Sequence, residues 1–382
     1  MNIGVDATAL YGRYSGVEYS LWNLLGGLNV VDGENDYTVY IPHDGPPEDH
    51  LTNFGPRWRW VRLPFAGGDK ARRVWWQQTQ LPLALARDGC NLLHSPTYIA
   101  PAWSPVPVVL TAYDLIALTH PAFATRLNRV HYRVLLPRSI ERARRVIVPS
   151  KSVQEEIARC VPAAAARTRV VPLALEPAFF ATYSEAQKEA VRQHYGLPQR
   201  FVLFVGNFEP KKNLRRVLEA FRAVPKAPPL VLAGGGRAWN TYELQHELQP
   251  PDPTSDAMNA SSLRVLSIGY VRRRDLPLLY ALCEAFIFPS LAEGFGLPVL
   301  EALACGATVI ASTRVPLPRL NEVALLCDPM EVQEIAHQLR RAVTESDVRA
   351  ELRHKGRHYA QPFTWRRTAA QTLDVYREAV SF

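Results

Sequence analysis

The sequence lacks several features that would place the protein in a familiar class at once. No stretch of its 382 residues approaches the roughly 18 uninterrupted apolar residues that a membrane-spanning helix needs. Its cysteines are odd in number, scattered and without C-x-x-C spacing, which favours reduced thiols over a disulfide framework: Cys90, Cys160, Cys283, Cys305 and Cys327. We therefore expect a cytoplasmic protein that is neither secreted nor integral to a membrane.

Two short motifs are missing as well. The turn after the first predicted strand has no G-x-G-x-x-G, the fingerprint with which a dinucleotide-binding fold holds phosphate. No D-x-D occurs in the chain, so no acidic pair of that kind is offered to a divalent metal ion. We expect no metal, no cofactor and no nucleic-acid partner.

The chain is rich in apolar residues, which make up 47% of it, and it carries a formal net charge of +8 at pH 7. Most of that net charge lies between residues 121 and 147, where seven arginines face one acid, Glu141. Such a stretch is either a solvated helix face or a surface for an anionic membrane or acceptor. Arginines and tryptophans also alternate between residues 57 and 76, which suits a membrane interface or stacked arginines on a structured loop.

Apolar runs alternate with helical patterns along the whole chain, as in parallel α/β sheets. The first series of predicted strands is Asn2–Val5, Tyr37–Ile41, Arg59–Leu63, Asn91–His94, Val106–Thr111 and Arg145–Pro149, with helices such as Val17–Leu28 and Trp75–Ala86 between them. The second series is Phe201–Val205, Leu230–Gly234, Val265–Ile268, Ala285–Phe288, Thr308–Ala311 and Ala324–Cys327.

This duplication predicts two doubly wound, Rossmann-like domains, residues 1–173 and 174–362, with a hinge near Val171–Pro177. Their active site is expected in the cleft that faces the carboxyl ends of both sheets. A final amphipathic helix is expected over residues 363–382, with Thr364 as its cap. The segment Pro250–Ser262 has the composition of a mobile loop.

The segment from Pro289 to Ser312 is the most informative one in the sequence. It places Glu293 and Glu301 eight residues apart, around a glycine-containing turn between a buried strand and a helix. Pro298 is expected to open that helix, with Glu301 on its first turn. The backbone amides there favour an anion, and a carboxylate can accept two hydroxyl hydrogen bonds from ribose or a sugar.

Lys211 and Lys212 stand at a second junction of this kind, where Asn213 is expected to cap the following helix. Opposite a helix N-terminus, two such lysines can hold a diphosphate. On a surface turn they are simply solvated.

These strings closely resemble the donor-binding signatures of retaining glycosyltransferases of family four, which have the GT-B fold. The resemblance implies that the final helix, residues 363–382, crosses back to the first domain. The resemblance spans nearly the whole chain and is strongest over Trp75–His120, Phe201–Phe221 and Gly269–Ser312. It implies that Lys212 holds the nucleotide diphosphate, that Glu293 contacts the donor sugar and that Glu301 contacts the ribose. It also implies donor contacts from Gly16, Asn207, Lys211, Gly294, Phe295, Gly296 and Leu297.

Three positions depart from the family pattern. Tyr113 stands where relatives carry a histidine thought to contact the transferred sugar, so its hydroxyl must replace that contact or activity suffers. Asn207 stands where many relatives have arginine, and Arg319 where they often have glutamate. Asp114, next to Tyr113, is a candidate for acceptor binding or for structural capping, whereas His94 and His120 are expected to be structural.

The resemblance implies transfer of a hexosyl unit from a UDP- or GDP-sugar to a glycan or lipid-linked acceptor, without metal and with retention. Peripheral contact with an anionic inner membrane face would bring the enzyme to such an acceptor. Two other hypotheses remain open: a catalytically impaired protein that only binds a nucleotide sugar, and a nicotinamide oxidoreductase, which the absent fingerprint disfavours.

Overall fold

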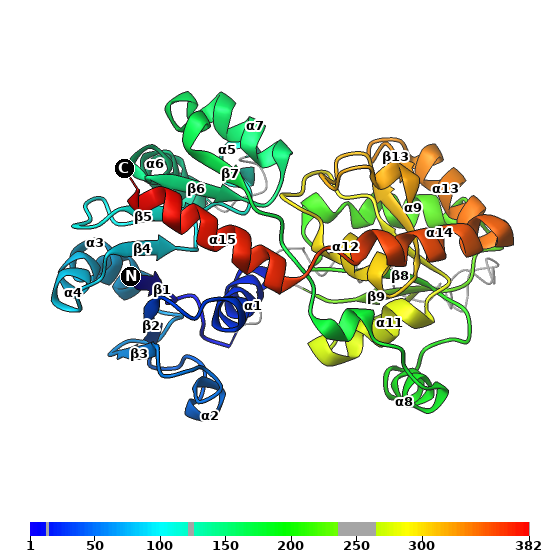
Figure 1. Ribbon diagram of the computed structural model, residues 1–382. Helices are drawn as coiled ribbons and strands as arrows, with labels where there is room; N and C mark the ends of the chain where they lie inside the picture. The colour runs from blue at the N-terminus through cyan, green and yellow to red at the C-terminus, as the bar shows by residue number, and fades with distance from the viewer. Residues whose placement is uncertain (13–14, 121–125, 236–264, 382) are drawn as a thin grey trace. The chain divides into compact units, whose positions relative to one another are not determined.

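The computed structural model describes residues 1–12, 15–120, 126–235 and 265–381, including their side chains except those of 126–131. The chain forms two compact units, which are described separately (Figure 1). The first comprises Met1–Ala174 together with Phe363–Phe382, and the second comprises Leu175–Pro362. The predicted mobile loop, Pro250–Ser262, lies outside the described residues.

The first unit is built on a parallel sheet with the strand order β3-β2-β1-β4-β5-β6-β7. Its strands are β1 Asn2–Asp6, β2 Asp36–Pro42, β3 Trp58–Leu63, β4 Leu92–Ser95, β5 Val108–Thr111, β6 Arg145–Val148 and β7 Thr168–Val170. The predicted strands correspond to β1 to β6, although β5 begins two residues later than expected. The short β7 was missed because three residues carry almost no periodic signal.

Helices cover both faces of this sheet: α1 Gly16–Val31, α2 Glu48–Leu51, α3 Lys70–Thr79, α4 Leu81–Arg87, α5 Ile116–Thr119, α6 Arg126–Arg142, α7 Lys151–Cys160 and α15 Trp365–Val380. A 3-10 turn, Pro162–Arg167, precedes β7. One core cluster joins the sheet to α1 and α15, and another joins it to α3, α4, α6 and α7.

The helical stretch predicted over Trp75–Ala86 is confirmed, but the structure divides it at Gln80 into the end of α3 and most of α4. Pro82 has no N–H to donate to a preceding turn, so it takes a place in the first turn of a new helix.

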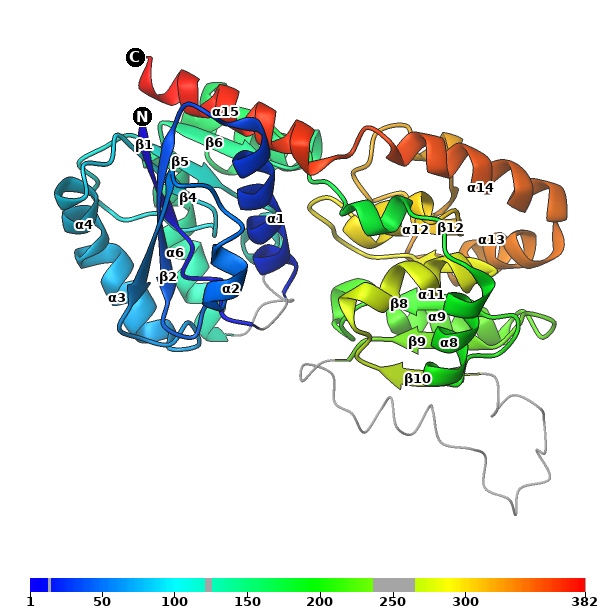
Figure 2. The ribbon, with the colours of Figure 1, turned by 60° about the horizontal axis from the view of Figure 1, so that its bottom comes forward.

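The C-terminal helix α15 belongs to the first unit, where it lies beside α1 (Figures 1 and 2). The Thr364 hydroxyl accepts a hydrogen bond from the Arg367 N–H, so the predicted cap is confirmed. The two helices approach closely at Gly27, where a Cβ atom would lie 2.7 Å from the carbonyl oxygen of Trp365. Only glycine permits this contact.

His94 anchors the same helix from inside the sheet. Its ring is fully buried, with Nδ1 2.7 Å from the Tyr376 hydroxyl of α15 and Nε2 2.8 Å from the Thr111 hydroxyl of β5. Burial lowers the pKa of His94 to about 3, so the ring stays neutral. His94 is structural, as expected.

The tryptophans between residues 57 and 76 mostly belong to the core. Trp58 is buried and stacks on Tyr37 with ring centroids 4.1 Å apart, and Trp76 is buried against Phe65. The interpretation of Trp58 and Trp76 as membrane-facing residues is therefore wrong. Trp75, one position away on α3, is 59% exposed.

The second unit is built on a parallel sheet with the order β10-β9-β8-β11-β12-β13. Its strands are β8 Val202–Val205, β9 Leu230–Ala233, β10 Val265–Gly269, β11 Ala285–Phe288, β12 Thr308–Ser312 and β13 Leu325–Cys327. Its helices are α8 Glu185–Tyr195, α9 Leu214–Arg222, α11 Leu276–Leu282, α12 Leu297–Ala304, α13 Val332–Thr344 and α14 Ser346–Ala360. Short 3-10 turns are Pro177–Phe180 (η3), Pro210–Lys212 (η4), Arg273–Asp275 (η5) and Leu320–Glu322 (η6).

Both sheets reverse their strand order at an equivalent place, between β1 and β4 in the first and between β8 and β11 in the second. The prediction of doubly wound α/β units is thus confirmed. In such sheets ligands bind beyond the carboxyl ends of the strands at the point of reversal. For the second unit this point is the end of β8 and the end of β11, the two junctions that the sequence singles out.

Candidate active site

The connection from β8 to α9 brings Lys211 and Lys212 to the carboxyl edge of the second sheet. Both lysines lie in η4, and Asn213 follows in the left-handed conformation with φ +62°. The expected side-chain cap by Asn213 is wrong. Its amide instead donates to the carbonyl oxygens of Pro289 and Pro329, at 2.9 and 2.7 Å, and so ties this connection to the end of β11.

The connection from β11 to α12 holds Glu293, and α12 itself carries Glu301. Gly296 precedes the helix with φ +98°, and a Cβ there would lie 2.6 Å from Val315 Cγ1, so this position requires glycine. The helix starts at Leu297, with Pro298 second. Glu301 is the fifth residue and lies on the second turn, not the first as predicted.

The structure brings Lys212 and Glu293 into direct contact. The Lys212 Nζ lies 2.6 Å from the Glu293 Oε1, and the two side chains are only 14% and 11% exposed. The ammonium group also lies 4.8 Å from the centroid of the Phe288 ring. Since an ammonium group has three donors, Lys212 can keep this ion pair and still donate to an anion.

Glu301 is buried, with a side chain 5% exposed. Its Oε1 accepts a hydrogen bond from Arg273 Nη1 at 2.5 Å, and its Oε2 accepts one from the Tyr280 hydroxyl at 3.0 Å. Burial, and after it the neighbouring Glu301 carboxylate, raise the pKa of Tyr280 well above its usual range, so the phenol remains a donor.

The other residues predicted for the donor line these same two connections. Asn207 is exposed and lies two residues after the end of β8, and Lys211 pairs with Glu209 at 3.5 Å. Gly294 and Phe295 are buried in the turn between Glu293 and the start of α12. The carbonyl of Gly296 accepts hydrogen bonds from Val299 and Leu300, while Leu297 is partly exposed.

Asp114 of the first unit has the bonds of a capping residue. Its Oδ1 accepts a hydrogen bond from the Ile116 N–H at 3.0 Å, and its Oδ2 accepts one from the Tyr98 hydroxyl at 3.1 Å. The alternative role of Asp114, acceptor binding, stays a prediction. Gly16 is the first residue of α1, and a Cβ there would meet nothing within 4 Å, so packing does not require glycine at this position.

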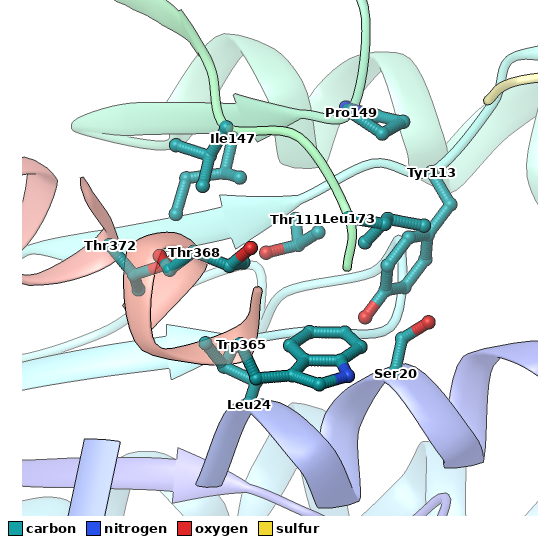
Figure 3. A pocket seen from close by; sticks show the side chains of 11 residues that line it. Ser20, Leu24, Thr111, Tyr113, Ile147, Pro149, Leu173, Trp365, Thr368 and Thr372 are labelled. Atoms are coloured by element: carbon teal, nitrogen blue, oxygen red, sulfur yellow. The ribbon is translucent and has the colours of Figure 1, made fainter. Parts of the chain in front are cut away.

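Tyr113 faces a small cavity of about 20 Å³ within the first unit. Figure 3 shows its hydroxyl directed toward the space between Trp365 and Ser20. The indole Nε1 of Trp365 is buried without a hydrogen-bond partner in the described part of the chain. Burial raises the pKa of Tyr113 above its usual range. The cavity is large enough for water but far too small for a sugar.

Two family models account for most of the chain. The model for glycosyl transferases group 1 matches residues 187–359, and the model for glycosyltransferase family 4 matches residues 14–179. O-antigen chain mannosyltransferase B of Escherichia coli is 31% identical over 276 residues, which cover 70% of each chain. The chain belongs to glycosyltransferase family 4.

Further similarities extend this assignment. The serotype-specific mannosyltransferase WbdA of Escherichia coli is 30% identical over 62% of the chain, a match that covers 29% of WbdA itself. Sucrose-phosphate synthase from Thermosynechococcus elongatus has a TM-score of 0.76, 21% identity, and coverage of 99% of this chain and 98% of its own. Anabaena HepE, solved with UDP-glucose, has a TM-score of 0.74 and 20% identity, with 99% of both chains covered.

As a member of this family the protein is a glycosyltransferase with the GT-B fold, as the sequence predicted, and not a nicotinamide oxidoreductase. The roles assigned to individual residues by resemblance stay predictions. Arg319, one of the departures from the family pattern, is 77% exposed and forms an ion pair with Glu322 at 2.6 Å.

The sequence analysis of this glycosyltransferase missed Arg273 and Tyr280. Arg273 belongs to a run of three arginines after β10, and Tyr280 to the apolar stretch of α11. The sequence offers a signal for Arg273, because it follows a predicted strand at the same sheet edge. Arg272 and Arg274 follow that strand equally well, so the signal does not single out Arg273.

Two kinds of feature are absent from the part of the chain that the structure describes. No three His, Cys, Asp or Glu side chains gather there as they would around a metal ion. No helix among them combines the length and the apolarity that crossing a bilayer demands. Independence from metal ions stays a prediction.

Proposed function

We propose that this glycosyltransferase moves a hexosyl unit from a UDP- or GDP-sugar to a glycan or lipid-linked acceptor, with retention of anomeric configuration and without a metal ion. The observation that carries the proposal is the Lys212–Glu293 ion pair, with Glu301 on the following helix, at the point where the strand order of the second sheet reverses. In this arrangement the Lys212 ammonium group, which can bind phosphate, and the carboxylates of Glu293 and Glu301, which can accept hydrogen bonds from hydroxyls, belong to the same edge of the sheet.

In this proposal each group has a separate task. Lys212 and the start of α12 stabilise the negative charge that develops on the leaving diphosphate. Glu293 accepts hydrogen bonds from the sugar hydroxyls, and Glu301 accepts them from the ribose. The bond between the anomeric carbon and the phosphate oxygen breaks as the acceptor oxygen bonds to the same face of that carbon. The acceptor proton passes to the leaving phosphate, so no separate base is needed.

The relatives guide the choice of donor. Several carry the name mannosyltransferase, and the structural neighbour HepE was solved with UDP-glucose. A panel of UDP- and GDP-sugars, headed by GDP-mannose and UDP-glucose, should be tested for binding and for slow hydrolysis. We expect one donor to be bound and hydrolysed. Binding without hydrolysis or transfer to any acceptor would favour the catalytically impaired protein instead.

We further propose that the protein is cytoplasmic and approaches a lipid-linked acceptor at an anionic membrane face. The loop after β4 carries Trp103, which is 62% exposed. It lies between α3 and α6, since Gln78 Oε1 accepts a hydrogen bond from the Ala102 N–H and Arg142 Nη1 donates to the Ala102 carbonyl. Exposed tryptophan beside arginines suits a lipid interface.

Reversing three exposed arginines of α6 tests this location: Arg133, Arg138 and Arg142. We expect weaker binding to vesicles that contain anionic lipid, by about 1 kcal/mol for each basic contact. Reversing three exposed arginines of the second unit, Arg222, Arg274 and Arg340, is the matched control. Equal partitioning of the unaltered protein onto neutral and anionic vesicles would favour a soluble acceptor.

A further inference from the structure

Arg273 connects two carboxylates of the second unit. Its Nη1 lies 2.5 Å from Glu301 Oε1, and its Nε lies 3.4 Å from Glu176 Oε2. Its guanidinium carbon lies 4.5 Å from the centroid of the Phe179 ring. The side chain is 29% exposed, and two ion pairs and a stacking contact hold it in place.

These contacts leave the Glu301 carboxylate fixed at both oxygens. Arg273 binds one oxygen and the fully buried Tyr280 donates its hydroxyl hydrogen to the other. A charge that is 5% exposed is costly unless it is paired and hydrogen-bonded. Arg273 and Tyr280 therefore stabilise the anion and also determine which way its oxygens point.

The arrangement still leaves room for a ligand. An ionised carboxylate has about four acceptor positions, two on each oxygen. Among the described residues, Arg273 and Tyr280 each take one position, on different oxygens. One position then remains on each oxygen, and two neighbouring acceptors of this kind match two hydroxyls on adjacent carbons.

We propose that Arg273 and Tyr280 are positioning residues that hold Glu301 so that its two oxygens receive the 2′- and 3′-hydroxyls of the donor's ribose. Glu176 and Phe179 in turn contact Arg273 and help to hold it in place. The inference rests on the proposed function, because it needs a nucleotide in this site. It assigns part of the specificity for ribonucleotides to two residues that do not touch the nucleotide.

The test compares a ribonucleotide with its 2′-deoxy counterpart, using calorimetry and whichever of UDP or GDP the unaltered protein binds. We expect the unaltered protein to prefer the ribonucleotide by about tenfold, the value of one hydrogen bond to a charged group. In Arg273→Gln and Tyr280→Phe this preference should fall to less than about threefold, with little change in affinity for the deoxynucleotide.

Arg274→Gln is the matched control, because this neighbouring arginine is 75% exposed and its Nε lies 3.8 Å from Asp275 Oδ1. It should keep the full ribose preference. Circular dichroism melts establish that each variant is folded, and Tyr280→Phe, which removes a single oxygen, serves if Arg273→Gln does not fold.

The possible outcomes separate this inference from the proposed function. Variants that retain the ribose preference of the unaltered protein overturn the positioning role. An unaltered protein that binds ribo- and deoxynucleotides equally also overturns it, while the proposed donor site stands. An unaltered protein that binds neither UDP nor GDP contradicts the proposed function, and this inference falls with it.

Discussion

Polar residues make different contacts in the two units. In the second unit, Lys212, Glu293, Glu301 and Arg273 form ion pairs at the sheet edge where the strand order reverses. In the first unit, His94 and Asp114 hydrogen-bond to residues of their own unit and so hold helices against the sheet or cap them. The same doubly wound architecture thus has ion pairs at the point of strand reversal in the second unit, whereas these two polar residues of the first unit stabilise its fold.

Replacing Glu293 gives the largest effect that this contrast predicts. With the donor identified by the panel, we expect Glu293→Gln to lower turnover by about 100- to 1000-fold, in the range found for the loss of one group that stabilises a transition state. Nucleotide affinity should change by less than about threefold, since the lost contact is to the sugar. Intact turnover in steady-state assays would contradict the assignment of the donor site.

Replacing His94 should affect stability and leave the donor site unchanged. Below pH 6.5 an unfolded histidine takes up a proton that the buried ring, with its pKa of about 3, does not. The free energy of unfolding therefore falls as the pH falls from 6.5 toward 3.

Between pH 6.5 and 5 we expect this histidine to cost the native protein about 2 kcal/mol of stability. His94→Gln should lose less stability over the same interval, as measured by denaturant titration. Equal pH dependence in the two proteins would show that His94 is not buried as a neutral group.

Replacing Tyr113 tests whether the first unit also contributes to the sugar-transfer reaction. We expect Tyr113→Phe to lower turnover by about tenfold, the value of one hydrogen bond, if its hydroxyl has taken over the contact of the family's histidine. Thermal melts should show little change in stability. Full turnover in Tyr113→Phe would show that the phenol only packs around the cavity beside Trp365 and Ser20.

The smallest effect is expected from chelation. Because cationic and backbone groups neutralise the leaving group in the proposed mechanism, activity should change by less than about twofold in EDTA. Loss of turnover that Mn²⁺ or Mg²⁺ restores would show that Lys212 and the start of α12 do not suffice.

The sequence analysis predicted the architecture well because strand and helix periods repeat over hundreds of residues. It located Lys212, Glu293 and Glu301 because their motifs are contiguous in the chain. It could not show that Lys212 pairs with Glu293, 81 residues away, or that Arg273 reaches Glu301. Such contacts depend on which strands become neighbours.

The same limit explains several errors. Asn213 has the residue type of a helix cap. Once β11 lies beside β8, however, its side-chain amide donates hydrogen bonds to the carbonyl oxygens of Pro289 and Pro329 instead. Trp58 alternates with arginines as an interfacial residue would, yet strand pairing stacks it on Tyr37. In both cases tertiary contacts override a local preference.

Calorimetric titration of UDP and GDP into the unaltered protein, Lys212→Ala and Lys226→Ala tests the donor site in the second unit most directly. Lys226 is an exposed lysine of the same unit, so Lys226→Ala should bind as the unaltered protein does. Lys212→Ala should bind more weakly by roughly 1.5 to 3 kcal/mol, because a charge-assisted contact to the diphosphate is lost. Unchanged nucleotide affinity in Lys212→Ala would contradict the account.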